Sequence, residues 1–190
     1  MVDTLPMVLG DTVATAQAAD NLLAARCVRG DTAAFDELVR LHRERVAGLA
    51  FRLLGWRHDI EDVVQDVFVI ALENLPKFRG ESRLRTWLFR ITANRCRRAL
   101  RRPRLLRGIV NSPPVASEGE RLDRETAAQV RAAVAALPVR DREVVVLRYL
   151  EDLPIEEIGQ LLGLSRNAVD VRLNRARRRL RPALSSMLED

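Results

Sequence analysis

The segment FRGESRLRTWLFRITANRCRRALRR, residues 78–102, carries the side chains needed to hold unpaired nucleic-acid bases. Aromatic rings offer faces on which bases stack, each stacked base contributing about 1–3 kcal/mol, and cationic side chains follow the phosphates. The candidate faces are Phe78, Trp87, Phe89 and Ile91. The polar candidates are the turn residues Arg79, Gly80, Glu81 and Ser82, the hydrogen-bonding residues Thr86 and Asn94, and the phosphate-binding residues Arg97 and Arg98. The alternative is that the apolar members, Leu88 above all, belong to the core.

A stripe of acidic residues marks the segment DIEDVVQDVFVIALENL, residues 59–75. At 100° per residue, its carboxylates fall within about one sixth of the circumference of a helix. They are Asp59, Asp62, Asp66 and Glu73, and apolar residues occupy most of the other side. A stripe of one charge inside a basic protein favours a surface that docks another protein. An ordinary solvated face is the alternative, and paired catalytic carboxylates are a weaker one because no polar pocket residues accompany them.

The segment IEEIGQLLGLSRNAVDVRLNRARRRL, residues 155–180, has the layout of a helix-turn-helix. Gly163 suits the left-handed conformation that ends a first helix, and Ser165 suits the cap of a second. On that second helix, one apolar stripe is expected to pack inward, namely Val169, Leu173, Ala176 and Leu180. A helix that docks through one stripe and presents polar groups on the other face suits the major groove of duplex DNA.

The expected DNA-reading face of this second helix combines amides and guanidinium groups. Its residues are Arg166, Asn167, Asp170, Val171, Arg172, Asn174, Arg175 and Arg178. Amides and arginines make paired hydrogen bonds to base edges, and flanking arginines bind phosphates. Asp170 is unusual on such a face because it repels phosphate, and its natural partner in a groove is a cytosine amino group. A plain helical hairpin with a solvated basic face is the alternative.

Helices are expected to position all these side chains, because apolar residues recur at three- and four-residue spacing without any sustained strand alternation. We therefore expect an all-α chain with two small helical domains. The first covers residues 20–103, with Asp31 as a helix N-cap, and the second, which contains the helix-turn-helix, covers residues 122–190. A stretch rich in Pro, Ser and Gly predicts a flexible linker at residues 104–121. Weak patterning predicts a flexible N-terminal arm at residues 1–19.

The composition favours a polyanionic partner and argues against several other classes of function. The net charge is +6, and the arginines gather in two clusters, at residues 95–107 and 166–181. Cys27, Cys96, His42 and His58 show no metal-ligand spacing, so neither a metal nor another cofactor is expected. No apolar run approaches the roughly 18 residues of a membrane helix, and the N-terminus lacks the layout of a signal peptide. We expect a cytoplasmic protein without membrane insertion.

Three motifs, in this order and spacing, resemble those of bacterial RNA polymerase sigma factors of the extracytoplasmic-function type. They are DIEDVVQDVFVIAL, KFRGESRLRTWLFRITANRCRR and LPVRDREVVVLRYLEDLPIEEIGQLLGLSRNAVDVRLNRARRRL. The likeness covers about residues 20–188. It implies a specificity subunit, and no enzyme, that binds core RNA polymerase and promoter DNA and assists DNA opening. Many relatives have a dedicated anti-sigma factor, so such a partner is also expected.

The resemblance gives each candidate surface a role. The first domain resembles sigma region two, which docks on the clamp helices of the largest polymerase subunit, here through Asp59, Asp62, Gln65, Asp66 and Glu73. Its loop and basic helix imply capture of a flipped base from the minus-ten element, through Phe78, Arg79, Gly80, Ser82, Trp87, Phe89, Ile91, Asn94, Arg97 and Arg98. The second domain resembles region four, whose helix from Arg166 would read the minus-thirty-five element. Asp170 and Val171 depart from relatives, which often have basic residues or Ser at these positions.

Two other functions fit parts of the sequence. A conventional helix-turn-helix repressor or activator would use its N-terminal domain to dimerise or to sense a ligand, but the acidic stripe and the aromatic–arginine segment would then be unexplained. A nuclease would use Asp62, Asp66 and Glu73 with magnesium, but these carboxylates lie along one helix and nothing else in the sequence converges on them. A membrane-surface role for the basic helix is the weakest alternative.

Overall fold

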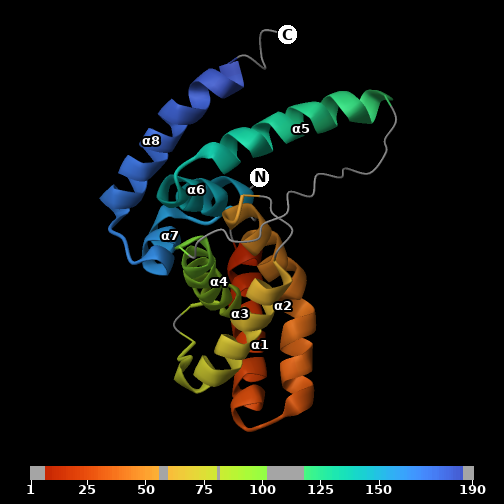
Figure 1. Ribbon diagram of the computed structural model, residues 1–190. Coiled ribbons are helices and arrows are strands. Elements are labelled where there is room, and N and C mark those ends of the chain that lie inside the picture. Colours follow the sequence, from red (N-terminus) through yellow and green to blue (C-terminus); the bar gives the residue numbers. More distant parts are fainter. Residues whose placement is uncertain (1–6, 56–59, 81, 102–117, 186–190) are drawn as a thin grey trace, which may run out of the picture.

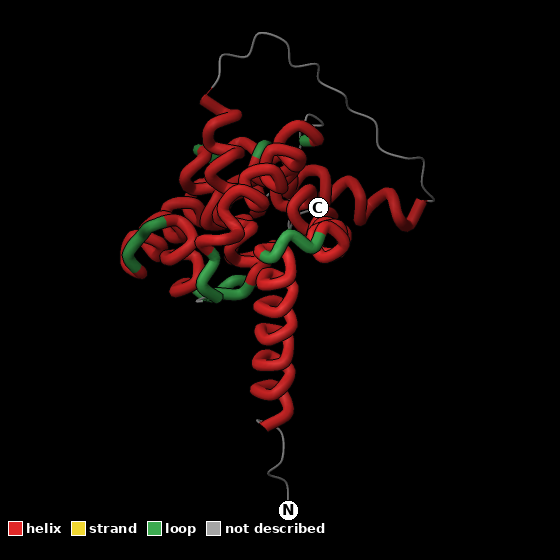
Figure 2. Tube along the Cα trace, turned by 90° about the horizontal axis from the view of Figure 1, so that it is seen from below, coloured by secondary structure: helices red, strands yellow, loops and turns green. Residues whose placement is uncertain are grey.

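The computed structural model describes residues 7–55, 60–80, 82–101 and 118–185, with backbone alone for residues 7–16 and 118–124. Over these ranges the chain folds into α-helices joined by short turns, and no strand occurs (Figures 1 and 2). The predicted all-α class with two small helical domains is therefore confirmed. None of the described helices is both long and apolar enough to span a membrane.

The first domain is a bundle of α1 to α4. Its elements are α1 (Met7–Val28), α2 (Thr32–Leu53), α3 (Glu61–Asn74), a 3₁₀ turn (Leu75–Lys77) and α4 (Leu84–Arg101). The predicted cap of α2 is confirmed, since a carboxylate oxygen of Asp31 accepts from the Ala34 N–H at 3.0 Å. Apolar side chains of all four helices form the core, among them the fully buried Leu38, Leu49, Leu88 and Phe89.

The first helix differs from the sequence-based expectation. Residues 1–19 were predicted as a flexible arm, but α1 begins at Met7, and its N-terminal half extends away from the rest of the bundle (Figure 2). The prediction was wrong for residues 7–19 because it relied on hydrophobic patterning. This segment is rich in alanine, which has the highest helix propensity of any residue and needs no amphipathic pattern to form a helix. Residues 1–6 lie outside the described residues.

The second domain contains the helix-turn-helix. Its elements are α5 (Glu118–Ala136), α6 (Val139–Val145), a π-helical turn (Val146–Leu150), α7 (Ile155–Leu162) and α8 (Arg166–Ser185). Gly163 ends α7 with a φ of +68°, and the Ser165 hydroxyl accepts from the Ala168 N–H at 3.2 Å at the start of α8. The predicted turn chemistry is confirmed. Of the predicted linker, residues 104–117 lie outside the described residues, and residues 118–121 belong to α5.

The two domains contact each other, with α4 against α7 and α2 against α6 (Figure 1). Arg52 of α2 forms an ion pair with Glu151, which follows the π-helical turn. Arg97 of α4 donates two hydrogen bonds to the carboxylate of Glu143 on α6, from Nε to Oε1 at 2.6 Å and from Nη2 to Oε2 at 3.2 Å. The first domain thus meets the second through basic side chains that face carboxylates.

Candidate nucleic-acid interface

The loop between the 3₁₀ turn and α4 places two aromatic rings together. The ring centroids of Phe78 and Trp87 lie 5.3 Å apart, with the ring planes tilted by 52°. Both side chains are half-buried, so each ring keeps an open part beside the loop. This edge-inclined arrangement is typical of stable aromatic pairs. The ring pair is therefore a fixed apolar surface at the beginning of the basic helix.

A groove of about 770 Å³ opens over this ring pair. Its lining combines the rings with cations and with one residue of the second domain, namely Lys77, Phe78, Arg79, Ser82, Trp87, Arg90 and Gln160. Lys77, Arg79 and Arg90 are exposed, so their charges face solvent around the rings. Aromatic faces among exposed cations are the combination that binds single-stranded nucleic acid. The structure thus brings together four of the predicted residues, Phe78, Arg79, Ser82 and Trp87. Glu81 lies outside the described residues.

Other residues predicted for this site lie elsewhere. Phe89 has no exposed surface and packs in the core, so its predicted role as a stacking face is wrong. Ile91 is half-buried against the same core. Thr86 is 1% exposed, and its hydroxyl donates to the Glu157 carboxylate of α7 instead of facing the groove. These corrections have one cause, since the core and α7 together cover the faces of α4 on which these side chains stand.

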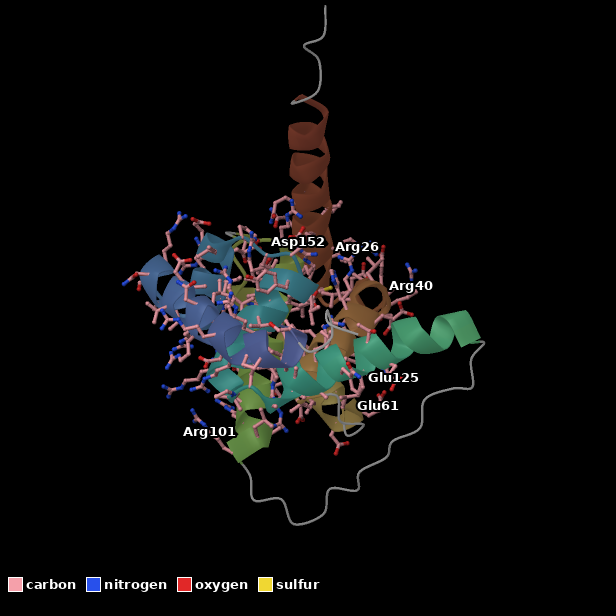
Figure 3. The ribbon with its side chains drawn as sticks, turned by 90° about the horizontal axis from the view of Figure 1, so that it is seen from above. Arg26, Arg40, Glu61, Arg101, Glu125 and Asp152 are labelled. Atoms are coloured by element: carbon pink, nitrogen blue, oxygen red, sulfur yellow. The ribbon has the colours of Figure 1, made fainter. Side chains whose placement is uncertain are left out.

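The basic half of α4 continues from the groove toward its C-terminal end. Asn94 and Arg98 are exposed, and Arg101 lies at the C-terminal end of the helix (Figure 3). Arg97 is engaged, because it donates to Asn94 Oδ1 at 3.0 Å as well as to Glu143. The cations that would follow phosphates are thus in place, although one of them is held by a carboxylate of the second domain.

The acidic stripe on α3 is present, and part of it is free to meet a partner. Asp62, Gln65 and Glu73 are exposed, whereas Asp66 forms an ion pair with Arg95 of α4. Asp59 lies outside the described residues. The ion pair with Arg95 orients the Asp66 carboxylate and partly neutralises the negative charge of the stripe at this position. No group of three or more His, Cys, Asp or Glu side chains suited to a metal ion occurs among the described residues.

Apolar residues beside the acidic stripe were missed by sequence reasoning. Val69 and Leu72 of α3 are 50% and 49% exposed, and they border a groove of about 380 Å³ that Phe35 and Val39 of α2 also line. Exposed apolar side chains grouped beside charges are typical of a protein-docking surface. The sequence did hold a signal for their exposure. On a helical wheel, both residues lie on the side of the carboxylates and outside the apolar stripe that faces the core.

The outward face of α8 has the predicted character. The predicted inward stripe is confirmed, with Val169, Leu173 and Ala176 fully buried and Leu180 packed against the core. Exposed side chains cover the opposite face, namely Arg166, Asn167, Val171, Asn174, Arg175 and Arg178, while Asp170 and Arg172 are half-buried.

Ion pairs engage two arginines of this face. Arg166 pairs with Glu156 of α7, and Arg175 lies 3.4 Å from the buried carboxylate of Asp141. Arg177, which is also exposed on α8, donates to the Tyr149 hydroxyl at 2.9 Å. The two amide side chains of the face, Asn167 and Asn174, remain exposed, and Asn174 Oδ1 accepts from Arg177 at 3.1 Å.

Known families match both domains. The family model for sigma-70 region 2 matches residues 38–105, and that for sigma-70 region 4 matches residues 127–180. The ECF RNA polymerase sigma-E factor of Haemophilus influenzae is 34% identical over 176 residues, which cover 85% of this chain and 93% of that protein. The RNA polymerase sigma factor CnrH of Cupriavidus metallidurans is 33% identical over 183 residues, covering 88% of this chain and 95% of that protein.

Solved structures agree with these sequence matches. CnrH in complex with the cytosolic domain of CnrY superposes with a TM-score of 0.66 at 34% identity, over 88% of this chain and 98% of that one. The sigma factor RpoE of Bartonella quintana, solved with the anti-sigma factor NepR, gives a TM-score of 0.64 at 23% identity, over 80% of this chain and 96% of that one. The second likeness shows the shared fold.

Proposed function

Because this chain belongs to the extracytoplasmic-function family of RNA polymerase sigma factors, we propose that it binds core RNA polymerase, directs it to specific promoters and assists the opening of promoter DNA. One observation carries the proposal. A single chain joins a groove that combines aromatic rings with cations to a helix-turn-helix with an amide-bearing outer face. The first suits unpaired bases and the second suits duplex DNA.

The polymerase-binding surface that we propose is the outer face of α3. Its exposed polar residues Asp62, Gln65 and Glu73 stand beside the apolar pair Val69 and Leu72. Apolar contacts surrounded by charges combine affinity with orientation, which a stable protein complex needs. Asp66, which forms an ion pair with Arg95, also belongs to the proposed set. Asp59 lies outside the described residues and belongs to the set on the resemblance alone.

The minus-ten site that we propose is the groove over Phe78 and Trp87. Extruding a base from a stack costs a few kcal/mol, and stacking on exposed rings offsets that cost. Arg79, Gly80 and Ser82 border the captured base, and Asn94, Arg97 and Arg98 follow the strand along α4. Ile91 and the buried Phe89 support the site from within.

The minus-thirty-five site that we propose is the outer face of α8. Asn167 and Asn174 are exposed amides suited to base edges, and Arg175 and Arg178 are suited to guanine or phosphate. Arg166 and Arg172 flank this face. Asp170 and Val171 would distinguish its preferred sequence, through a cytosine amino group and a thymine methyl group respectively.

The contact between the domains supports the proposal that DNA binding requires polymerase. Arg97 and Thr86 are engaged by carboxylates of the second domain, and Gln160 borders the base groove. We propose that the free chain binds promoter DNA weakly and that core polymerase holds the two domains at the separation that the two promoter elements demand. CnrH was solved in complex with the cytosolic domain of CnrY. We propose that this chain also binds a protein partner, namely an anti-sigma factor that restrains it.

Runoff transcription tests the proposal directly. Purified core polymerase is supplied with genomic fragments in the presence and absence of this protein. We expect transcripts from defined start sites only in its presence. Absence of affinity for core polymerase would overturn the proposal, and a stable dimer bound to a palindromic duplex would point to a conventional repressor or activator instead.

The Asn94→Ala variant separates base capture from duplex binding. Asn94 is exposed on α4, and its Oδ1 accepts from Arg97 of the same helix at 3.0 Å. We expect the variant to weaken open-complex formation more than binding to a duplex minus-thirty-five fragment. Equal effects on both would count against base capture at this groove.

A further inference from the structure

The loop that carries the proposed base-capture residues is held from outside by α1. Gln17 Nε2 donates to the carbonyl oxygen of Ser82 at 3.0 Å and to that of Gly80 at 3.4 Å. Asp20 Oδ2 accepts from the backbone N–H of Leu84 at 3.1 Å. These bonds join residues more than sixty positions apart in the chain, so tertiary contacts with α1 hold the loop in place.

The bond from Asp20 replaces a missing helix cap. The first N–H groups of a helix lack partners within it, and a Ser, Thr, Asp or Asn at the cap position usually satisfies one of them. Arg83 precedes the first residue of α4, Leu84, and has no acceptor to offer in its side chain. The carboxylate of Asp20 meets this N–H and also places a negative charge at the positive end of the helix. The start of α4, one turn before Trp87, is thereby anchored to α1.

Asn21 restricts the loop sterically. Gly80 has a φ of +71°, and a Cβ built there would lie 2.8 Å from Asn21 Oδ1. Asn21 Oδ1 also accepts from Gln17 Nε2 at 3.3 Å. Residues spaced by three and four positions share one face of a helix, so Gln17, Asp20 and Asn21 form a single contact surface against the loop. This surface precedes residues 38–105, which the region 2 family model matches.

We infer that Gln17, Asp20 and Asn21 are positioning residues that hold the base-capture loop in the conformation that discriminates among bases. The inference rests on the proposed function, because it concerns the same groove. None of the three lines the groove, so they act through the backbone of Gly80, Ser82 and Leu84. A loop ordered before binding avoids the entropy of ordering when a base arrives, and it accepts one base shape better than the others.

Matched substitutions on α1 test the inference in the full-length protein with core polymerase. Asp20→Ala removes the acceptor for the Leu84 N–H, whereas Asp20→Asn keeps an acceptor oxygen. Gln17→Glu keeps the shape of the side chain but removes the N–H groups that bond the loop carbonyls. Asp36→Ala removes an exposed acidic residue of α2 and serves as the control for charge.

The readout is base discrimination during open-complex formation. The probe is a promoter fragment recovered by runoff transcription and remade with each of the four bases at each minus-ten position of the non-template strand. For Asp20→Ala and Gln17→Glu, we expect the preference for the favoured base to fall by about tenfold, a loss of the size expected when hydrogen bonds that position the loop are removed. Asp20→Asn should retain most of the preference, and Asp36→Ala all of it. Affinity for core polymerase should be unchanged in every variant.

Two results would overturn the inference, and a third would concern only the proposed function. Unchanged base preference in both Asp20→Ala and Gln17→Glu shows that α1 does not position the loop. A uniform loss on all four bases, together with weaker binding to core polymerase, shows a role in stability alone. If the wild-type protein shows no base preference and Trp87→Ala behaves like the wild type, the proposed base capture at this groove is wrong. The role of α1 is then not the cause of the failure.

Discussion

Replacement of Glu143 with alanine is expected to loosen the contact between the two domains and to free Arg97. The Glu143 carboxylate is 3% exposed and receives two roughly parallel hydrogen bonds from Arg97, whose side chain is 25% exposed. Such bidentate pairs are stronger than single contacts between neutral groups. Because α4 and α6 belong to different domains, the pair stabilises the closed arrangement of the chain and not the core of either domain.

The size of the effect follows from this burial. Removing one partner of a fully buried ion pair typically costs about 3–5 kcal/mol, because the other charge is left without compensation. Arg97 lies at the edge of the contact and can regain water, so we expect a smaller coupling of about 1–3 kcal/mol. That corresponds to roughly a 5- to 150-fold shift toward separated domains.

A double-mutant cycle measures this coupling. Glu143→Ala, Arg97→Ala and the double variant are compared by urea unfolding, with the exposed pair Arg43 and Glu61 as a matched control. The control pair joins α2 to α3 within one domain, and we expect its coupling to be below about 1 kcal/mol. Small-angle scattering should show a larger radius of gyration for Glu143→Ala than for the wild type. In the absence of polymerase, Glu143→Ala should also bind single-stranded DNA more tightly than the wild type does. A coupling no larger than that of the control pair, with unchanged scattering, would refute this role for the pair.

Three further predictions concern stability and DNA binding. Asp31→Ala should lower the free energy of unfolding by about 1 kcal/mol and Asp31→Asn by much less, as measured by urea unfolding, because only the alanine variant loses the cap of α2. Burial lowers the pKa of His42, so its contribution to stability is present above the unfolded pKa of about 6.5 and is lost as the pH falls through the folded value. His42→Gln should therefore lose less stability than the wild type between pH 7 and pH 5 in urea unfolding. Leu173→Ala should cost about 2–5 kcal/mol and abolish duplex binding by the helix-turn-helix, whereas Val171→Ala, on the exposed face, should leave thermal stability within about 0.5 kcal/mol.

Local chemistry made part of this fold predictable. Asp31, Gly163 and Ser165 act within one turn of their own helices, and their roles followed from residue type and position alone. The inward stripe of α8 was predictable for the same reason, because a helix presents its faces with a fixed period. These features need no knowledge of the rest of the chain.

Features that depend on distant contacts could not be predicted in this way. Phe89 is aromatic and lies in a basic segment, but its burial depends on which face of α4 meets α2 and α3. The engagement of Thr86 by Glu157 depends on the placement of the second domain. The bond from Asp20 to the start of α4 joins two helices that no sequence pattern connects. In each case the residue type suits more than one environment, and the tertiary structure determines which environment the side chain occupies.

The closed arrangement and the proposed binding of DNA compete for the same donor groups. A guanidinium that donates both of its parallel N–H groups to Glu143 cannot offer them to a phosphate at the same time. Only molecules with separated domains offer all of these donors to a single strand. The apparent affinity of the free chain is therefore the intrinsic affinity multiplied by the fraction of such molecules. A partner that binds only the separated form removes this reduction without touching DNA. In the proposed scheme, polymerase bound to the outer face of α3 acts in this way when it holds the domains apart and leaves the groove over Phe78 and Trp87 open. The Glu143 carboxylate would then occupy the donors of Arg97 in place of a phosphate, and a promoter strand would displace it only after polymerase has been recruited.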